Sequence, residues 1–292
     1  MKKYLGFLTM FILSLMIFSI FNQAKQVKES FTYFPTNHDV LFQTAETTLT
    51  FMNDTNKGYE LLWRTGSILD RKAYLRQDIS LLFGNGKLVA LMGKDWKQNE
   101  DKITLESTVI QNESANYKAI SFHHSEIHDY EQITSSQKHS HDELYVLNSK
   151  YHPLHSFRLP VHQQDEEWKK LIDEYIQNKL DDSLKAAQKQ FLFDQSQYTI
   201  FPLTKIYHYE EQPLPGFTEK ETKEIVGRLW EGLYKNYFLG IKNKDGTITD
   251  PIDSTIPIIL LAKDQTHLYV TSKLKDGEIM LLKQRIVRTP DS

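Results

Sequence analysis

Residues 79–92 read ISLLFGNGKLVALM, and this stretch indicates how the chain folds. Two apolar runs, at 79–83 and 87–92, are separated by Gly-Asn-Gly at 84–86. Asparagine and glycine readily adopt the positive φ angles that a tight hairpin turn requires. The stretch therefore predicts two antiparallel strands joined by a short turn.

Further strand patterns surround this hairpin. Apolar and polar residues alternate at 102–111 and at 117–127, which predicts a second antiparallel pair. Shorter strand candidates in the first half are 40–42, 47–52, 59–64 and 144–147. The C-terminal part contains the strand candidates 241–244, 247–249, 256–262, 267–272 and 278–286. The last three of these, with turns between them, predict a meander near the end of the chain.

Two segments have helical spacing instead. Between Asp165 and Phe191, apolar residues recur at intervals of three and four, which places them on one face of a helix. A second helix is expected to begin at Thr218, because Thr218 and Glu221 have the capping-box spacing, and Gly240 can end it. Both helices have a broad apolar face and should pack against other elements.

Together these patterns predict an α+β fold. Antiparallel sheets and hairpins would pack with at least two long amphipathic helices, behind an N-terminal membrane helix. The region 25–292 divides into a strand-rich part, 30–160, and a mixed helix and strand part, 161–292. The pattern fits one domain or two equally well.

The N-terminal segment is the second strong signal. Residues 4–21, YLGFLTMFILSLMIFSIF, are uncharged and apolar, and they follow Met1-Lys2-Lys3. As a helix this run would reach about 27 Å, close to the hydrocarbon thickness of a bilayer. We therefore expect 1–24 to be a signal-anchor that contacts the membrane through 4–21, with the C-terminal region as a single-pass extracytoplasmic domain.

A cleaved signal peptide, which would give a secreted protein, is the alternative. Signal peptides end in small residues, and cleavage after Ala24 would place Asn22 at one of those positions. Lysines flank the apolar run on both sides, so the charge difference across it is small. The sequence favours the uncleaved anchor.

The composition argues against some classes of partner and of catalytic group. The formal net charge is -3, with acidic and basic residues interspersed, which argues against a nucleic-acid partner. The chain has no cysteine, so it has neither disulfides nor a thiolate nucleophile. Its hydrophobic fraction of 40% is that of a globular protein with a core.

Histidine is unevenly distributed. Eight of the 11 histidines fall between 123 and 162. Because side chains alternate along a strand, His124, Glu126 and His128 would share one face, and so would His139 and His141. Imidazole and carboxylate groups bind zinc and other divalent transition metals, so these five residues are the candidate metal ligands.

A second interpretation of the same histidines is structural. The segment 132–142 is polar and rich in serine, which is typical of a solvated loop whose histidines face water. His124 to His128 also lacks the His-Glu-x-x-His order of a helical zinc site. On this interpretation the protein needs no cofactor.

Other catalytic motifs are absent from the sequence. It has no Gly-x-Ser-x-Gly elbow, no phosphate-binding glycine loop and no kinase motif set. The tryptophans Trp168 and Trp230 lie on the apolar helix faces, which favours a place in the core over a ligand groove. The sequence identifies no catalytic residue and favours a role other than an enzyme.

Three functional hypotheses follow. The first is a membrane-tethered, non-catalytic domain that binds or positions an extracytoplasmic protein or envelope component. The second is a metal-dependent protein, such as a hydrolase, that uses the histidine cluster. In the third, histidine protonation near pH 6 regulates an interface.

Overall fold

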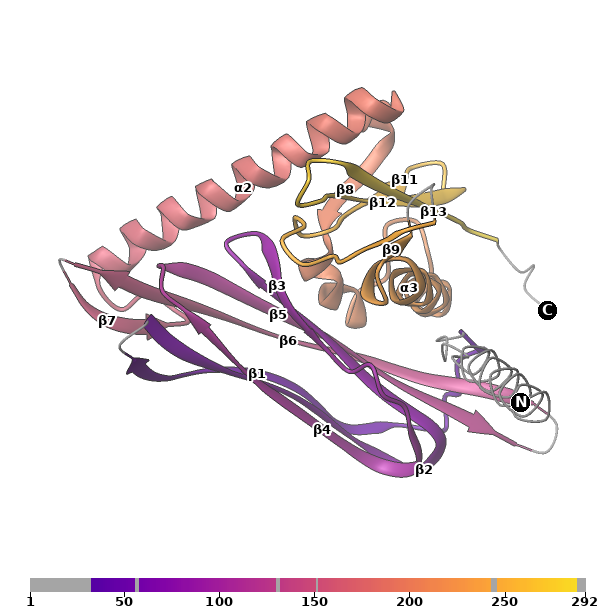
Figure 1. The fold of residues 1–292 in the computed structure, drawn as a ribbon. Helices are drawn as coiled ribbons and strands as arrows, with labels where there is room; N and C mark the ends of the chain where they lie inside the picture. The colour runs from indigo at the N-terminus through magenta and orange to yellow at the C-terminus, as the bar shows by residue number, and fades with distance from the viewer. Residues whose placement is uncertain (1–32, 56–57, 130–131, 151, 243–245, 288–292) are drawn as a thin grey trace, which may run out of the picture. The chain divides into compact units, whose positions relative to one another are not determined.

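The computed structural model describes residues 33–55, 58–129, 132–150, 152–242 and 246–287 (Figure 1). The elements below all belong to one unit of the chain. Their arrangement follows from one very long strand and from a second, smaller sheet.

Strand β2, Gly58–Gly84, organises the larger sheet. Its first half pairs antiparallel with β1, Phe42–Thr55, and β4, Lys97–Gln111. Its second half pairs with β3, Lys87–Met92, and β5, Ala115–His128. The predicted β2–β3 hairpin is confirmed, and Asn85 and Gly86 in its turn have φ angles of 49° and 79°. Both values lie in the region that favours these two residue types.

The larger sheet folds over itself at a break in the β2–β4 register between Ile68 and Ala73. The order β1-β2-β5-β6-β7 is completed by β6, Ile133–Ser149, and β7, His152–Phe157. Strands β1 and β6 contact each other and nearly close the sheet into a barrel, with β1 and β4 as one layer and β5 and β6 as the other (Figure 1). A β-bulge or register break is a usual way for a strand to bend in this manner.

The pattern of buried residues along β2 agrees with this arrangement. Buried and partly exposed residues alternate from Gly58 to Leu69, because only one face of that half is covered. From Arg76 to Phe83 every residue is buried, because other elements cover both faces. The apolar core between the layers consists of Leu49, Tyr59, Leu61, Trp63, Leu82, Ala115, Tyr117, Ala119, Leu144 and Val146.

The polar segment 132–142 is not the solvated loop of the structural interpretation. It forms most of β6, and Thr134, Ser135, Ser136, His139 and Ser140 are buried in it. Its polar residues are accommodated because they find partners inside the fold. One example is the Ser136 hydroxyl, which donates to the carbonyl oxygen of Val40 at 2.8 Å.

The second sheet has the order β13-β12-β11-β8. It contains β8, Tyr198–Pro202, β11, Ile258–Ala262, β12, His267–Lys273, and β13, Ile279–Arg285. The predicted C-terminal meander is therefore confirmed, with β8 added from a distant part of the sequence. The short strands β9, Ile241–Lys242, and β10, Ile248–Thr249, form a separate pair.

Helix α2, Gln163–Phe191, contacts β12 and β13, and α3, Glu219–Leu233, also contacts β13. Both agree with the predicted helices. The α3 capping box between Thr218 and Glu221 is present, and a π-helical turn, η3 at Tyr234–Phe238, precedes Gly240. Two 3₁₀ turns, η1 at Gln195–Gln197 and η2 at Leu203–Glu210, flank β8.

The predicted α+β class with at least two long amphipathic helices is wrong. Strands contain 51% of the described residues and helices 25%, so the chain is mainly antiparallel sheet. Helix α2 has 29 residues, whereas α3 has only 15. The sequence patterns underestimated the strands, because β2 and β6 are far longer than the short apolar segments that marked them.

The predicted membrane placement is also contradicted. Across the described ranges, no helix combines the length and the apolar character needed to cross a membrane. Helix α2 is long enough, but it carries acidic residues in its first turn and a lysine in its last. This finding does not support the transmembrane and signal-anchor assignment, or the single-pass localisation. The run 4–21 that suggested them lies outside the described residues.

Candidate functional site

The five residues predicted as metal ligands lie on one face of two neighbouring strands. His124, Glu126 and His128 alternate along β5, and His139 and His141 alternate along β6. The β5–β6 register places all five side chains on the same face, the one that contacts η2 and α3. The predicted alternation is correct, but the side chains are spread along the strands.

His139 already uses both ring nitrogens. Its Nε2 accepts a hydrogen bond from the indole Nε1 of Trp230 at 2.6 Å, and its Nδ1 contacts the carboxylate of Glu210. Burial raises the pKa of Glu210, but its interactions with His139 and Lys138 outweigh this effect and bring it to about 2. A nitrogen that accepts a hydrogen bond has no lone pair left for a metal. This group therefore joins β6 to η2 and α3.

His124 is enclosed by aromatic rings. Phe122 stacks beside it, with ring centroids 6.0 Å apart, and Trp96 meets it edge-on at 5.9 Å. Burial, together with the positive charge of Arg76, lowers the pKa of His124 to about 3. The ring is therefore neutral near pH 6 and cannot act as the pH sensor of the third hypothesis.

The remaining candidates have separate partners. His128 contacts Glu126 and stacks on Tyr74, with ring centroids 3.7 Å apart. His141 stacks on Tyr207 with centroids 3.4 Å apart. Among the residues that the structure describes, no three His, Cys, Asp or Glu side chains are grouped closely enough to hold a metal ion. The structure thus places the five predicted ligands on one face, brings Glu126 and His128 into contact, and leaves His124, His139 and His141 apart from that pair.

His123, on the other face of β5, links a serine and a carboxylate. Its Nε2 lies 2.7 Å from Oγ of Ser140, and its Nδ1 lies 2.8 Å from Oδ2 of Asp78. The hydroxyl of Ser67 donates to the same aspartate at 2.7 Å. Serine, histidine and aspartate in this order resemble the groups that activate a serine nucleophile.

This group is closed to substrates. His123 is 0% exposed, Asp78 1% and Ser140 8%. The Ser140 hydroxyl also shares a 2.6 Å hydrogen bond with Thr47 of β1, so it is held from both layers. A substrate carbonyl would have to come within about 3–3.5 Å of the nucleophile, which this burial prevents. We assign the group to the polar core that ties the two layers together.

Local sequence patterns could not identify this polar core. Asp78, His123 and Ser140 come from three strands that pair only in the folded chain. The one local signal is Arg-Gln-Asp at 76–78, which directly precedes the apolar run at 79–83. Arg76 is fully buried there and donates to the carbonyl oxygen of Asp101 at 2.6 Å.

A more accessible site lies along β13. Within the described part of the chain, β13 pairs with β12 on one side and has no strand on the other. The amide of Ile286 donates to Thr266, and the amide of Leu274 donates to Glu278, at the two ends of the β12–β13 pair. Hydrogen-bonded pairs alternate with non-hydrogen-bonded pairs along an antiparallel ladder, so the N–H and C=O groups of the even-numbered residues of β13 point towards β12. The odd-numbered residues from Ile279 to Arg285 therefore direct their N–H and C=O groups to the open edge.

Three hollows follow this edge and share wall residues. The largest, of about 670 Å³, lies beside the first half of β13. The next, of about 260 Å³, is lined by the centre of β13 and by α3, and it extends over Leu268 and Val270 of β12. The two share Asn236 and Leu282. A small hollow of about 20 Å³ continues past Arg285 and shares Arg228 and Gln284 with the second. We refer to the three together as the β13 groove.

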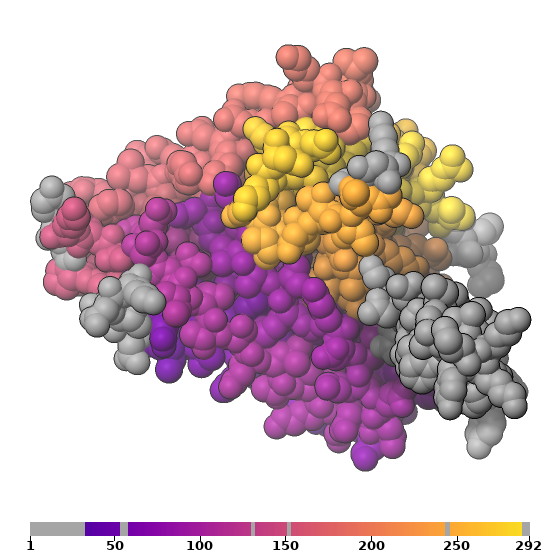
Figure 2. All heavy atoms as spheres, viewed as in Figure 1, coloured from indigo at the N-terminus to yellow at the C-terminus, as the bar shows by residue number. Residues whose placement is uncertain are grey.

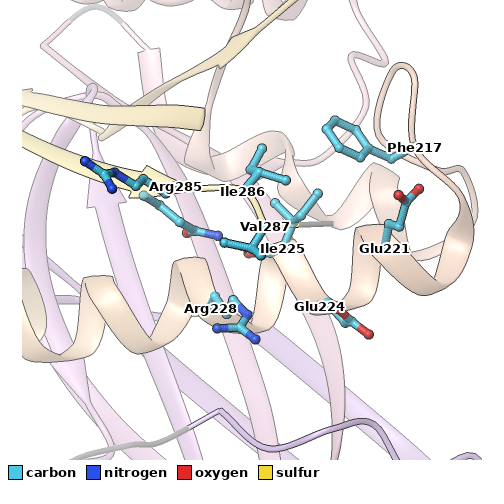
Figure 3. Close-up of a pocket in the computed structure, with 9 residues that line it drawn as sticks. Phe217, Glu221, Glu224, Ile225, Arg228, Arg285, Ile286 and Val287 are labelled. Carbon is cyan, nitrogen blue, oxygen red and sulfur yellow. The ribbon is translucent and has the colours of Figure 1, made fainter. Parts of the chain in front are cut away.

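The two ends of the β13 groove differ in character. The large hollow is lined mainly by apolar side chains, among them Phe191 at the end of α2 and Ile241 of β9. At the other end, Ile225 and Arg228 of α3 face the chain after β13, where Ile286 and Val287 form the opposite wall (Figure 3). The groove therefore combines an unpaired strand edge with side-chain pockets along its whole length.

Comparison with known proteins assigns no family to this chain. No family model matches the sequence, and no curated protein matches it. Among solved structures, the apo structure of Bacteroides uniformis β-glucuronidase 3 is similar at 13% identity and a TM-score of 0.23. The similarity covers 41% of this chain and 15% of that one, and it supports no inference about fold or function.

Proposed function

We propose that this protein is a non-catalytic binding domain that captures an extended segment of a partner protein as an added strand beside β13. The observation that carries this proposal is the open edge of β13 inside the β13 groove. In strand addition, main-chain hydrogen bonds supply affinity, and pockets for alternate side chains supply specificity.

The walls of the groove indicate the chemistry of the partner segment. Beside Ile279 and Leu281 they are apolar, because Phe191 and Ile241 line the same hollow. Towards the end of the strand, Lys283 and Arg285 are exposed and positively charged. A matching segment therefore presents alternating apolar residues at one end and acidic residues at the other.

A second copy of the chain fits this edge less well. Antiparallel self-pairing of β13 about Leu282 would place Ile279 opposite Arg285 and Leu281 opposite Lys283. In both of these pairs an apolar side chain would lie opposite a charged one, so the favourable cross-strand contacts that stabilise a sheet would be lost. Charged residues on an edge strand also discourage this kind of self-association. The edge is better suited to a different polypeptide.

Synthetic heptapeptides test the proposal. For antiparallel addition the matched sequence is Glu-Thr-Glu-Thr-Val-Thr-Val, and the reversed sequence tests parallel addition. Two further versions of the binding peptide carry N-methyl groups at either the odd or the even positions. Because only every second amide faces β13, one of these versions should bind at least about tenfold more weakly than the other. Fluorescence anisotropy with labelled peptides measures this difference.

A scrambled peptide of the same composition is the control and should bind weakly. If neither orientation binds, or if both methylated versions bind alike, strand addition is wrong. The chain alone should be monomeric in light scattering after gel filtration. A dimer that disappears when the β13 edge is altered would assign the edge to a second copy instead.

A further inference from the structure

A separate hollow of about 350 Å³ is lined by four lysines from three parts of the chain. It lies between α2, the β2–β3 turn and the β12–β13 turn, three segments that meet on the face of the molecule seen in Figure 2. Its charged lining residues are Lys87, Lys179, Lys273, Lys275, Asp182 and Asp253. Four positive groups against two negative ones give the hollow an excess of positive charge, although the whole chain carries -3.

The main chain around this lysine hollow is held firmly. Lys87 forms an antiparallel bridge with Thr255, whose amide donates to the carbonyl oxygen of Lys273 at 2.9 Å. The amide of Ile256 donates to the carbonyl oxygen of Gly86 at 3.0 Å. These bonds place Lys87 and Lys273 on either side of one short segment, so their backbone positions are set by the fold.

Two of the four lysines have partners within the hollow. Lys275 pairs with Asp253 at 2.8 Å. The Nζ of Lys179 donates to the carbonyl oxygen of Asn85 at 2.9 Å and lies 4.3 Å from the centre of the Tyr175 ring. Among the described residues, neither Lys87 nor Lys273 has a carboxylate within ion-pair distance. The unbalanced charge of the hollow therefore comes from this pair.

We propose that the lysine hollow binds a ligand through a phosphate or carboxylate group held by Lys87 and Lys273. A concave site lined by charge of one sign concentrates ligands of the opposite sign. Lysine ammonium groups bind phosphate and carboxylate oxygens through charge-assisted hydrogen bonds. Tyr175, which is 55% exposed at the rim, and the amide of Asn178 can contact the uncharged part of the ligand. This site is distinct from the β13 groove, and the two share only Leu274 among the residues that line them.

Titration followed by ¹H–¹⁵N NMR tests this site, with sodium pyrophosphate and sodium succinate as separate probes at constant ionic strength. Saturable shifts are expected at the amides of Gly86, Thr255 and Lys273. In the double variant K87Q/K273Q the affinity should fall by about tenfold or more. The control variant K72Q/K97Q removes two exposed lysines of the larger sheet, outside the lysine hollow, and should bind both probes like the natural chain.

The two probes distinguish the sources of the anionic group. Saturable binding of pyrophosphate alone assigns a phosphate ligand, and binding of succinate alone assigns a carboxylate. Shifts that do not saturate with either probe, or equal affinity in the two double variants, overturn the site. Heptapeptide binding at the β13 groove should be unchanged in K87Q/K273Q, so failure of one proposal does not imply failure of the other.

Discussion

The indole nitrogen of Trp230 donates a hydrogen bond to Nε2 of His139, which joins α3 to the outer face of β6. The donor leaves Nε2 without a proton in the neutral ring, so Nδ1 carries the proton and faces Glu210. One imidazole thereby connects a helix, a 3₁₀ turn and a strand. This group is one of several attachments between the larger sheet and the part of the chain that contains the second sheet, and another is the bridge between Lys87 and Thr255.

Trp230→Phe should destabilise the protein by about 1–3 kcal/mol, because it leaves the buried Nε2 of His139 without a donor. The ring volume changes little compared with truncation to alanine, so the loss reports mainly the hydrogen bond. Urea unfolding measures the difference. Trp168→Phe, on the partly exposed side of α2, is the control and should change the free energy by less than about 0.5 kcal/mol. Equal effects of the two substitutions would contradict the role given to the indole nitrogen.

Glu210→Gln should make the free energy of unfolding vary less with pH in the acid range. The pKa of Glu210 is lowered from 4.5 to about 2 in the folded chain, so its contribution is present above pH 4.5 and is lost as the pH falls through 2. The natural chain should therefore exceed E210Q in unfolding free energy by on the order of 3 kcal/mol near neutral pH. The gap should narrow below pH 4.5.

Chemical unfolding at several pH values measures this gap. Glu211→Gln is the matched control, because Glu211 is the exposed neighbour in sequence and its substitution should leave the profile unchanged. A gap between the natural chain and E210Q that stays constant from pH 7 to 3 would show that Glu210 is not held as an anion by His139 and Lys138.

The contact between His155 and Asp165 at the start of α2 should give the free energy of unfolding the opposite pH dependence. Burial lowers the pKa of His155, but hydrogen bonds to Asp165 and to the Pro153 carbonyl oxygen outweigh it, and the net shift is upward from 6.5. The raised pKa stabilises the fold below pH 6.5, and this contribution is lost as the pH rises through the folded value. Because the His155 side chain is 38% exposed, the effect should stay below about 1 kcal/mol.

NMR titration of the His155 ring in the natural chain and in Asp165→Asn measures this effect. The apparent pKa should fall in the variant. The unfolding free energy lost in His155→Gln should be greater at pH 5.5 than at pH 8.5. A ring pKa that is the same in both proteins would show that the hydrogen bond to Asp165 does not form in solution.

The sequence predicted correctly those elements whose conformation is set by residues close together in the chain. Asn85 and Gly86 favour a tight turn, and the Thr218 and Glu221 capping box marks where α3 begins; the structure confirms both. The C-terminal meander was also predictable, because Asp276 and Gly277 separate two clear apolar runs. In each case a few neighbouring residues contain the whole signal.

The rest of the fold depends on partners that lie far apart in sequence. Strand β6 could not be predicted at Ser136 to Ser140 from its own composition, because it is stabilised by hydrogen bonds to β1 and β5. Alternation correctly placed His139 and His141 on one face, but it could not show that Glu210 and Trp230 would use the nitrogens of His139. A candidate ligand therefore has to be checked against all its neighbours.

Ser140→Ala should weaken the fold without removing any activity. It deletes the hydroxyl that contacts both His123 and Thr47, so a loss of about 1–3 kcal/mol in unfolding free energy is expected. The natural chain should not react with a fluorophosphonate probe, which labels activated serines. Labelling that disappears in S140A would instead show that Ser140 is an accessible nucleophile.

Two adjacent prolines test the geometry of β13. Proline removes an N–H group, which an edge strand tolerates only where that group points away from its neighbour. Leu282→Pro removes a donor directed at β12 and should cost about 3 kcal/mol or more of unfolding free energy. Leu281→Pro removes an outward donor and should cost much less, yet it should weaken heptapeptide binding by at least about tenfold because that donor is one of those the added strand would use. Thermal unfolding and anisotropy on both variants measure the two effects. Equal destabilisation would show that the even-numbered residues of β13 do not direct their N–H groups to β12, and full binding by L281P would exclude strand addition at this edge.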